Sequence, residues 1–354
     1  LVEGSVVDLD IDFTLLAGRT IGIGAGSAAA SLNGTGTLTN QGNLAFSGGI
    51  LGVDTVNNGT ITTTDDTYTV DGDLILGNIG SIDLSGSKVL AGAGTFVSTG
   101  TLSLNGETIA GNFVQQSGDL DVLGVITVDG VLQFGAGAST FYDATVLDGA
   151  GTLINQNNFD IFGNDIDVTH VVNEGRIGFG NVTLTGSQII NTATGIFEVG
   201  LDGGGAIDMA AGETTTNAGL IDILDFNTFD FFDGVLENSG IINIGNGAEL
   251  AILGGTLSML DGGTLTGTGS VTLASELNID TGVNFLLGSG GPSIELTNGD
   301  ITGGGTLTND SSLAFFSSGL ISVAALANTG DMTFNAGTFS IGSGVDFTNE
   351  AGGT

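Results

Sequence analysis

Carboxylates are the residues of this chain whose number and spacing are sufficient for chemistry. Hydrolysis of a glycosidic bond needs carboxylates that converge on that bond, and Asp residues at alternate positions place two carboxylates on one face of a strand. The acidic clusters are Asp8/Asp10/Asp12, Asp119/Asp121, Asp160, Asp165/Asp167 and Asp222/Asp225. A polysaccharide-cleaving or polysaccharide-binding protein with a lateral acidic groove is therefore one hypothesis for the chain.

The partners that such an enzyme needs are scarce. Lyases that act on acidic sugars use cations, and the chain has three basic residues, Arg19, Lys88 and Arg176. Its one histidine, His170, has no partner at a suitable spacing, which argues against Ser-His-Asp catalysis. The chain has no Trp and two Tyr, so it would form a poor groove for stacking sugars. We predict no catalytic residues and no enzymatic activity.

Calcium binding is a second chemistry that Asp and Asn oxygens support. The segment Asn164-Asp165-Ile166-Asp167 places two carboxylates on one face of a strand. However, the chain contains neither an EF-hand loop nor an array of Gly-Gly-x-Gly-x-Asp nonapeptides. A solvated acidic face explains the clusters better, so we predict no metal site and no cofactor beyond loose Ca²⁺ binding by surface carboxylates.

Threonine ladders of the kind that bind ice are a third possibility for a repetitive strand surface. Thr60/Thr62 would begin such a ladder, but the corresponding positions of other repeats are Ser81/Asp83 and Asp119/Asp121. The array is not sustained, which argues against ice binding.

The elements that position these side chains are set by a repeat of the form Asn-x-Gly-x-apolar-x-apolar. Clear copies begin at Asn40, Asn78, Asn173, Asn217, Asn238 and Asn328. Apolar residues two and four positions beyond the glycine alternate with small or polar residues, which predicts a half-buried strand in each repeat. The inward pairs are Leu44/Phe46, Leu102/Leu104, Leu120/Val122, Phe159/Ile161, Phe197/Val199, Leu257/Met259, Leu277/Ile279 and Leu313/Phe315, and Val7/Leu9 and Ile21/Ile23 can serve as inward pairs in the less regular first coils.

A second marker shares this period of roughly 19 residues. It has the form Gly-x-Gly followed by Thr or Ser and an apolar residue, and it begins at Gly34, Gly92, Gly149, Gly267 and Gly303. A unit of this length is too short for a βαβ crossover. Three short strands and three tight corners fit it, and such units bury their apolar faces only when stacked. We therefore predict an all-β fold: a single elongated β-solenoid over 1–354, with about 18 coils of roughly 19 residues and a length of about 85 Å.

Four segments depart from the regular pattern: 1–41, 135–147, 200–234 and 285–305. The third contains Asp225-Phe226-Asn227-Thr228-Phe229-Asp230-Phe231-Phe232-Asp233, in which four Phe stand among Asp residues. We expect two of these Phe to point inward and the others to cover a lateral loop. The alternative is that the exposed Phe form a contact patch for another chain.

The corner asparagines suggest an inter-coil ladder. Asn tolerates positive φ and can bond its own backbone two residues on, and stacked Asn amides can bond to one another. The candidate ladder residues are Asn40, Asn57, Asn78, Asn155, Asn173, Asn217, Asn238, Asn309 and Asn328. The alternative is that each is a solvent-facing turn residue.

Composition excludes several classes of protein. The chain has 39 acidic and 3 basic residues, a net charge of −36, which excludes nucleic acid binding and disfavours anionic membrane surfaces. Cys is absent, so neither a disulfide scaffold nor a Cys-type zinc site is expected. No apolar run is long enough for a transmembrane helix, so we predict no membrane insertion. The 65 Gly residues follow no Gly-X-Y period, which excludes a collagen-like chain.

The ends of the sequence carry neither a signal peptide nor a polar cap, and the chain does not begin with Met. We expect a segment of a larger product. Uncapped solenoid ends would pair either with further copies of the chain, head to tail, or with flanking domains.

The corners Gly34-Thr35-Gly36-Thr37-Leu38-Thr39-Asn40 and Asn238-Ser239-Gly240-Ile241 resemble the repeats of bacterial β-helical surface proteins and exoproteins. These include autotransporter passengers and filamentous-haemagglutinin-like adhesins. The resemblance implies a right-handed parallel β-helix, export to the bacterial surface or medium, and glycans as candidate partners. We therefore predict a non-catalytic extracellular structural protein, serving as a stalk or adhesin or as a head-to-tail filament.

Overall fold

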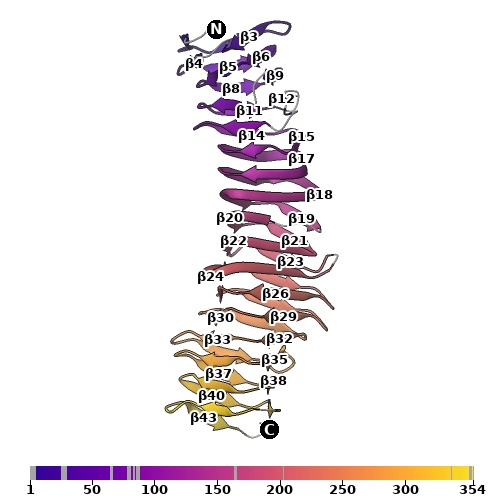
Figure 1. The fold of residues 1–354 in the computed structure, drawn as a ribbon, viewed down its shortest axis with the longest axis vertical. Coiled ribbons are helices and arrows are strands. Elements are labelled where there is room, and N and C mark those ends of the chain that lie inside the picture. The colour runs from indigo at the N-terminus through magenta and orange to yellow at the C-terminus, as the bar shows by residue number, and fades with distance from the viewer. Residues whose placement is uncertain are drawn as a thin grey trace. The chain divides into compact units, whose positions relative to one another are not determined.

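The computed structural model describes most of the chain as β-strands. The described residues are 5–24, 30–63, 67–77, 81–82, 84, 88–162, 166–201, 203–335, 337–350 and 353. No helix occurs among them. They form a β-solenoid of about 15 turns with ~21 residues per turn, and Figure 1 shows the strands of successive turns stacked in layers. The predicted all-β solenoid is confirmed, while its handedness stays a prediction.

A turn consists of three strands joined by tight corners. In one turn, β25 (Leu220–Ile223), β26 (Thr228–Phe232) and β27 (Val235–Asn238) lead to β28 (Ile241–Ile244), which pairs with β25. The pairing is parallel and in register, with Leu220 beside Ile241 and Ile223 beside Ile244. Residues at equivalent positions of successive turns therefore lie beside one another in the sheet.

The turn is longer than the sequence markers predicted. The corner residues Asn40 and Asn57 are 17 positions apart, whereas Asn191 and Asn217 are 26 apart. A corner can take extra residues without disturbing the strands on either side, because only the strands have to stay in register. The roughly 19-residue spacing therefore gave too many coils.

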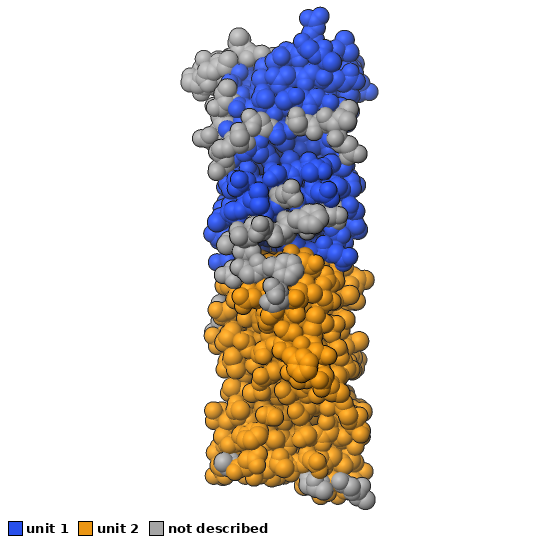
Figure 2. Space-filling view, turned by 90° about the vertical axis from the view of Figure 1, so that its right-hand side faces the viewer, with its two compact units in different colours: residues 1–159, 167–169 blue, residues 160–166, 170–354 orange. Residues whose placement is uncertain are grey.

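The structure divides into two compact units, coloured separately in Figure 2. Unit 1 comprises Leu1–Phe159 with Asp167–Thr169, and unit 2 comprises Asp160–Ile166 with His170–Thr354. The prediction of one elongated domain over 1–354 stays a prediction.

Unit 1 contains three series of stacked strands. We call the series that carries the corner asparagines the ladder series: β2 (Phe13–Leu15), β5 (Thr37–Asn40), β8 (Asp54–Asn57), β11 (Leu74–Leu76), β14 (Thr95–Ser98), β17 (Asn112–Val128) and β18 (Val131–Asn155). A second series is β1 (Val6–Asp8), β4 (Ser31–Asn33), β7 (Ile50–Leu51), β10 (Thr67–Val70), β13 (Val89–Ala91) and β16 (Thr108–Ile109). The third is β3 (Thr20–Ile23), β6 (Asn43–Phe46), β9 (Thr60–Thr63) and β12 (Ser81–Ile82), and β15 (Leu102–Asn105) pairs with β17.

Unit 2 repeats this arrangement. Its ladder series runs through β20 (Ile166–Asn173), β22 (Val182–Asn191), β24 (Gly205–Asn217), β27, β30 (Thr256–Met259), β33 (Glu276–Ile279), β36 (Asp300–Thr302), β39 (Gly319–Ser322) and β42 (Phe339–Ile341). The second series is β19 (Asn158–Phe162), β21 (Arg176–Gly180), β23 (Ile196–Val199), β25, β28 and β31 (Thr264–Gly267), and a separate sheet holds β34 (Asn284–Leu287), β37 (Thr306–Asn309), β40 (Ala325–Asn328) and β43 (Asp346–Asn349). The third is β26, β29 (Glu249–Ile252), β32 (Ser270–Leu273), β35 (Ser293–Leu296), β38 (Ser312–Phe315) and β41 (Asp331–Phe334).

The predicted inward pairs form the core of both units. Leu44 and Phe46 are 0% and 1% exposed, and Leu257 and Met259 are both 0% exposed. Most of the other predicted pairs are buried in the same way. The exceptions are Leu102, whose partner Leu104 is buried, and Val7, Leu9 and Ile21 near the start of the chain, all of which are half-buried. Burial of apolar area is the main stabilising term of such a core, so period-2 alternation is enough to place it.

The corner asparagines form the predicted ladder, and they are not solvent-facing turn residues. Asn173, Asn191 and Asn217 are 0% exposed. The Nδ2 atom of Asn173 donates to Oδ1 of Asn191 at 2.8 Å, and the ladder continues to Asn217 and then Asn238, each at 2.7 Å. Shorter ladders join Asn40 to Asn57, and Asn309 to Asn328 and Asn349. Asn191 was not among the predicted ladder residues, and Asn78 lies outside the described residues.

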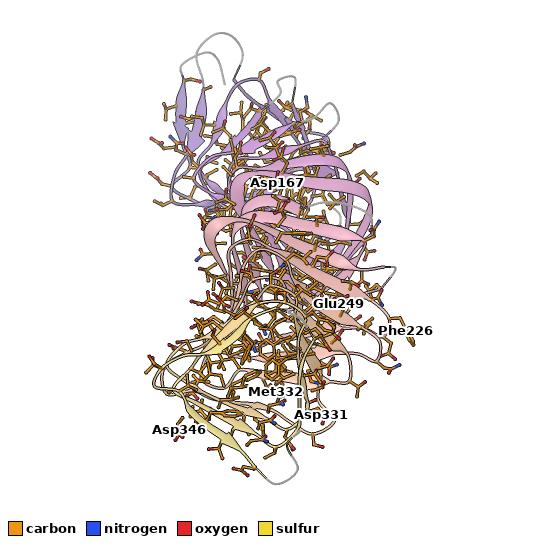
Figure 3. All side chains as sticks on the ribbon, turned by 60° about the horizontal axis from the view of Figure 1, so that its bottom comes forward. Asp167, Phe226, Glu249, Asp331, Met332 and Asp346 are labelled. Atoms are coloured by element: carbon orange, nitrogen blue, oxygen red, sulfur yellow. The ribbon has the colours of Figure 1, made fainter. Side chains whose placement is uncertain are left out.

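The irregular segments have specific structural causes. The segment 135–147 lies inside the continuous strand β18, where the pairing with β17 shifts register twice, at a β-bulge next to Gln116 and again between Leu123 and Val125. In 200–234, Phe229 and Phe231 are buried as predicted, while Phe226 is 77% exposed. Phe226 has a φ of 62°, and Figure 3 shows it at the outer edge of the fold.

Candidate functional site

The predicted acidic clusters are spread over different corners and faces. Asp10 and Asp119 are exposed. The side chain of Asp121 and all of Asp165 lie outside what the structure describes. Within the described part of the chain, no three Asp, Glu or His side chains, His170 included, lie close enough together to hold a metal ion.

Many of the aspartates bond to the backbone of the next turn. In unit 1, Oδ1 of Asp54 accepts the N–H of Asp73 at 3.0 Å, and Oδ1 of Asp73 accepts the N–H of Thr95 at 3.0 Å. The same bond joins Asp12 to Thr37, Asp71 to Ala93, Asp225 to Asn246 and Asp300 to Leu320. A carboxylate can only accept hydrogen bonds, so it suits corners where the strand ladder leaves N–H groups unpaired. These acids stabilise the stacking of turns.

One cation organises two carboxylates on the outer face of unit 2. Arg176 on β21 lies 2.5 Å from Asp160 on β19 and 2.5 Å from Glu198 on β23. The hydrogen bonds that Arg176 donates to Glu198 are the main cause that raises the pKa of Arg176 above its usual value, with Asp160 adding to it. A Cβ at Gly178 would lie 2.4 Å from Asp160 Oδ1, so only glycine leaves room for this arrangement. Asp160 therefore has a structural partner.

Asp222 and Asp225 are the predicted pair that the fold brings together. Both line a depression of about 560 Å³ in unit 2, with Asn227 and Asn243. Oδ1 of Asp222 accepts a hydrogen bond from Nδ2 of Asn243 at 2.7 Å, and Oδ1 of Asp225 accepts the N–H of Asn246 at 2.7 Å. Each carboxylate is thus already engaged by a neighbouring turn.

Asp230 is the acid whose surroundings are closest to those of a general acid. It lines a depression of about 210 Å³ with Thr183 and Thr228. Burial, and then the nearby charge of Glu249, raise the pKa of Asp230 above its usual value. Glu249, labelled in Figure 3, is not among the residues that line this depression, and its Oε1 accepts a hydrogen bond from Thr272 at 2.5 Å. Among the described residues that line this depression, Asp230 is the one carboxylate, where glycoside hydrolysis uses two.

A neutral depression in unit 1, which we call the glutamine trough, was not predicted from the sequence. Its volume is about 480 Å³, and its lining includes Val97, Val114, Gln116, Gln133 and Gln156. No ionisable side chain is among the described residues that line it. The signal was present in the sequence as Gln at three corners, but their register could not be known without the pairing of β17 with β18.

Comparison of the chain with protein-family models, with curated proteins and with solved structures gave no match. Among the residues that the structure describes, none forms a helix of the length and apolarity needed to cross a membrane. The fold and the geometry of its surfaces are therefore the basis for a functional proposal.

Proposed function

We propose that the chain is a non-catalytic extracellular structural protein, an acidic β-solenoid that acts as a stalk or adhesin on a bacterial surface. One observation supports this proposal most strongly: the polar side chains at the corners form hydrogen bonds between turns. The corner asparagines bond to one another, and aspartates such as Asp54 and Asp73 bond to the next turn. Side chains committed to stacking are suited to a scaffold and unsuited to binding a reacting substrate.

Two further features support this proposal. The corners resemble those of bacterial β-helical surface proteins, which act outside the cell. The sequence also offers trypsin-like proteases only three sites, Arg19, Lys88 and Arg176. Arg176 is held between two carboxylates, so a protease that needs an extended, accessible Arg would cleave there slowly.

A polysaccharide-cleaving enzyme is the second candidate, because two depressions in unit 2 contain carboxylates. Asp222 and Asp225 line one, and Asp230 lines the other. The test is an assay for new reducing ends with neutral and acidic polysaccharides, run on the parent chain and on Asp225→Asn and Asp230→Asn. The structural proposal predicts no release above background by any of the three proteins. Release that disappears in either variant, with folding unchanged, would make the protein an enzyme.

The location is tested separately. Antibodies raised against the chain should label intact cells that produce it, and the label should be lost after treatment of the cells with a broad-specificity protease. Labelling only after the cells are opened would contradict the extracellular assignment.

A further inference from the structure

The outer face of the ladder series in unit 1 carries a continuous row of uncharged side chains. Thr39 pairs with Val56, Val56 with Ile75, Ile75 with Val97, Val97 with Val114, and Val114 with Gln133, on successive turns. Ile75 is 38% exposed, and Val56, Val97 and Val114 are half-buried. Five steps of ~4.8 Å give the row a length of about 24 Å. An exposed apolar row on a chain with a net charge of −36 indicates a contact surface.

The row ends in the glutamine trough, and a β-bulge shapes that end. Gln115 pairs with Phe134 and Ser117 pairs with Gly137, so one residue of β17, Gln116, faces two residues of β18. Bulges are common beside functional sites because they redirect side chains. A Cβ added to Gly137 would lie 3.0 Å from the carbonyl oxygen of Gln116, so glycine there lets the bulge pack closely.

The chemistry of the trough selects a hydroxyl-rich, uncharged ligand. Val97 and Val114 offer an apolar floor, and glutamine amides offer both donors and acceptors. Gln133 Nε2 donates to Gln156 Oε1 at 2.9 Å, which fixes the orientation of both amides. A few oriented polar groups above an apolar floor are typical of small-molecule sites. A charged ligand would find no counter-charge among the described lining residues.

The charges beside the row also favour an uncharged ligand. Asp54 lies two residues before Val56 on β8, and Asp73 lies two residues before Ile75, at the corner that precedes β11. Both carboxylates bond to backbone N–H groups of the next turn. Carboxylates beside the row would repel an anionic polymer, whereas they can accept hydrogen bonds from hydroxyl groups.

We propose that the glutamine trough and the row from Val56 to Val114 bind a chain of neutral polysaccharide lying across successive turns. This inference rests on the proposed stalk or adhesin function and names the class of ligand that such a protein would hold.

The test is affinity electrophoresis of the whole chain in native gels that contain a soluble polysaccharide. The neutral probes are hydroxyethyl cellulose, dextran and barley β-glucan, and the acidic probes are alginate and pectate. At least one neutral probe should retard the parent chain, and neither acidic probe should. The double variant Gln116→Ala/Gln133→Ala should bind that probe about tenfold more weakly, the effect of about one lost net hydrogen bond.

The matched control is Gln188→Ala, which removes an exposed glutamine from β22 in unit 2 and should leave retardation unchanged. A thermal melt of each variant checks folding. If the double variant melts at a lower temperature than the parent chain, the single variant Gln116→Ala, which alters an exposed side chain, replaces it.

Three results would overturn the proposal: no retardation by any neutral probe, equal retardation by alginate or pectate, or unchanged binding by the trough variants. These failures leave the structural function standing. In contrast, release of reducing ends would refute the structural function even if retardation were observed.

Discussion

The two units build the same ladder series from different interactions. In unit 2 the inward corner position is Asn on four successive turns, Asn173, Asn191, Asn217 and Asn238, with hydrogen bonds along the whole run. In unit 1 the corresponding positions after Asn57 are Leu76, Ser98, Gln115 and Phe134, all buried. Oε1 of Gln115 is buried without a hydrogen-bond partner. At these positions unit 2 has a continuous run of amide hydrogen bonds, whereas unit 1 combines the apolar Leu76 and Phe134 with Gln115, whose Nε2 donates to the Gly100 carbonyl of the neighbouring turn at 2.7 Å.

The outward positions of the ladder series show the same kind of difference, with apolar side chains in unit 1 and hydrogen-bonded side chains in unit 2. Unit 1 carries the row of Val56, Ile75, Val97 and Val114. Unit 2 carries Ser258 and Asn278, in which Asn278 Nδ2 donates to Ser258 Oγ at 3.0 Å, and Glu276, which accepts from Thr256 at 3.2 Å. Side chains at equivalent positions of successive turns therefore have to match one another. Apolar contacts and hydrogen bonds both meet this requirement. A face left apolar is then available for binding.

The largest effect is expected at the centre of the continuous ladder. Asn217→Ala removes two ladder bonds and a bond to the Ile241 carbonyl, and leaves a donor on Asn191 and an acceptor on Asn238 unpaired in the core, at a cost of about 3–5 kcal/mol. Asn57→Ala in unit 1 removes one ladder bond, from Asn40, and the bonds to Gly59 of its own corner, and should cost about 2 kcal/mol. Equilibrium urea unfolding measures both. Equal losses at the two positions would show that the continuity of the ladder adds nothing.

The next effect concerns the outer face of unit 2. Arg176→Met leaves Asp160 and Glu198 facing each other without a cation and should destabilise the chain by roughly 1–2 kcal/mol, a figure kept low because all three groups are partly exposed. Added salt should shrink the loss. Arg19→Met, at an exposed position of unit 1, is the control and should change stability by less than about 0.5 kcal/mol. A loss that is unaffected by salt would indicate a packing effect.

A pH effect is expected from unit 1. Glu107 is 1% exposed, and burial raises its pKa above the usual 4.5. The folded chain therefore favours the neutral carboxyl. The contribution of Glu107 to the free energy of unfolding is complete below pH 4.5 and is lost as the pH rises through the raised pKa. Glu107→Gln should thus be more stable than the parent at pH 7 but not at pH 4, as measured by thermal melts. Glu237→Gln on β27 is the control. A gain of equal size at both pH values would assign the effect to packing.

The smallest effect tests the comparison directly. Ser258→Val/Asn278→Val converts part of the outer face of unit 2 to the chemistry of unit 1, replacing one hydrogen bond by apolar contact. Because these terms nearly offset one another, the unfolding free energy should change by less than about 0.5 kcal/mol. A loss above about 2 kcal/mol would show that unit 2 depends on polar bonds on its outer face.

Much of the candidate surface could not be predicted from sequence. The pair Asp222/Asp225 was predicted because its members are close in the sequence, and the fold places both in one depression. The glutamine trough joins Gln116, Gln133 and Gln156 from three turns, and the bulge in β18 lies opposite Gln116. Turn lengths vary between neighbouring turns, so no fixed period could have aligned these residues.

The sequence by itself determined the fold class, the inward pairs and the asparagine corners, because a period-2 pattern and a repeated turn residue act locally and need no knowledge of the neighbouring turn. Only the tertiary structure decided which side chains meet across turns: the pairing of Arg176 with Asp160 and Glu198, the aspartates bonded to the next backbone, and the row from Val56 to Val114. The physical reason is that these contacts depend on how many residues each corner holds, and a corner of any length can connect strands whose register is fixed by stacking.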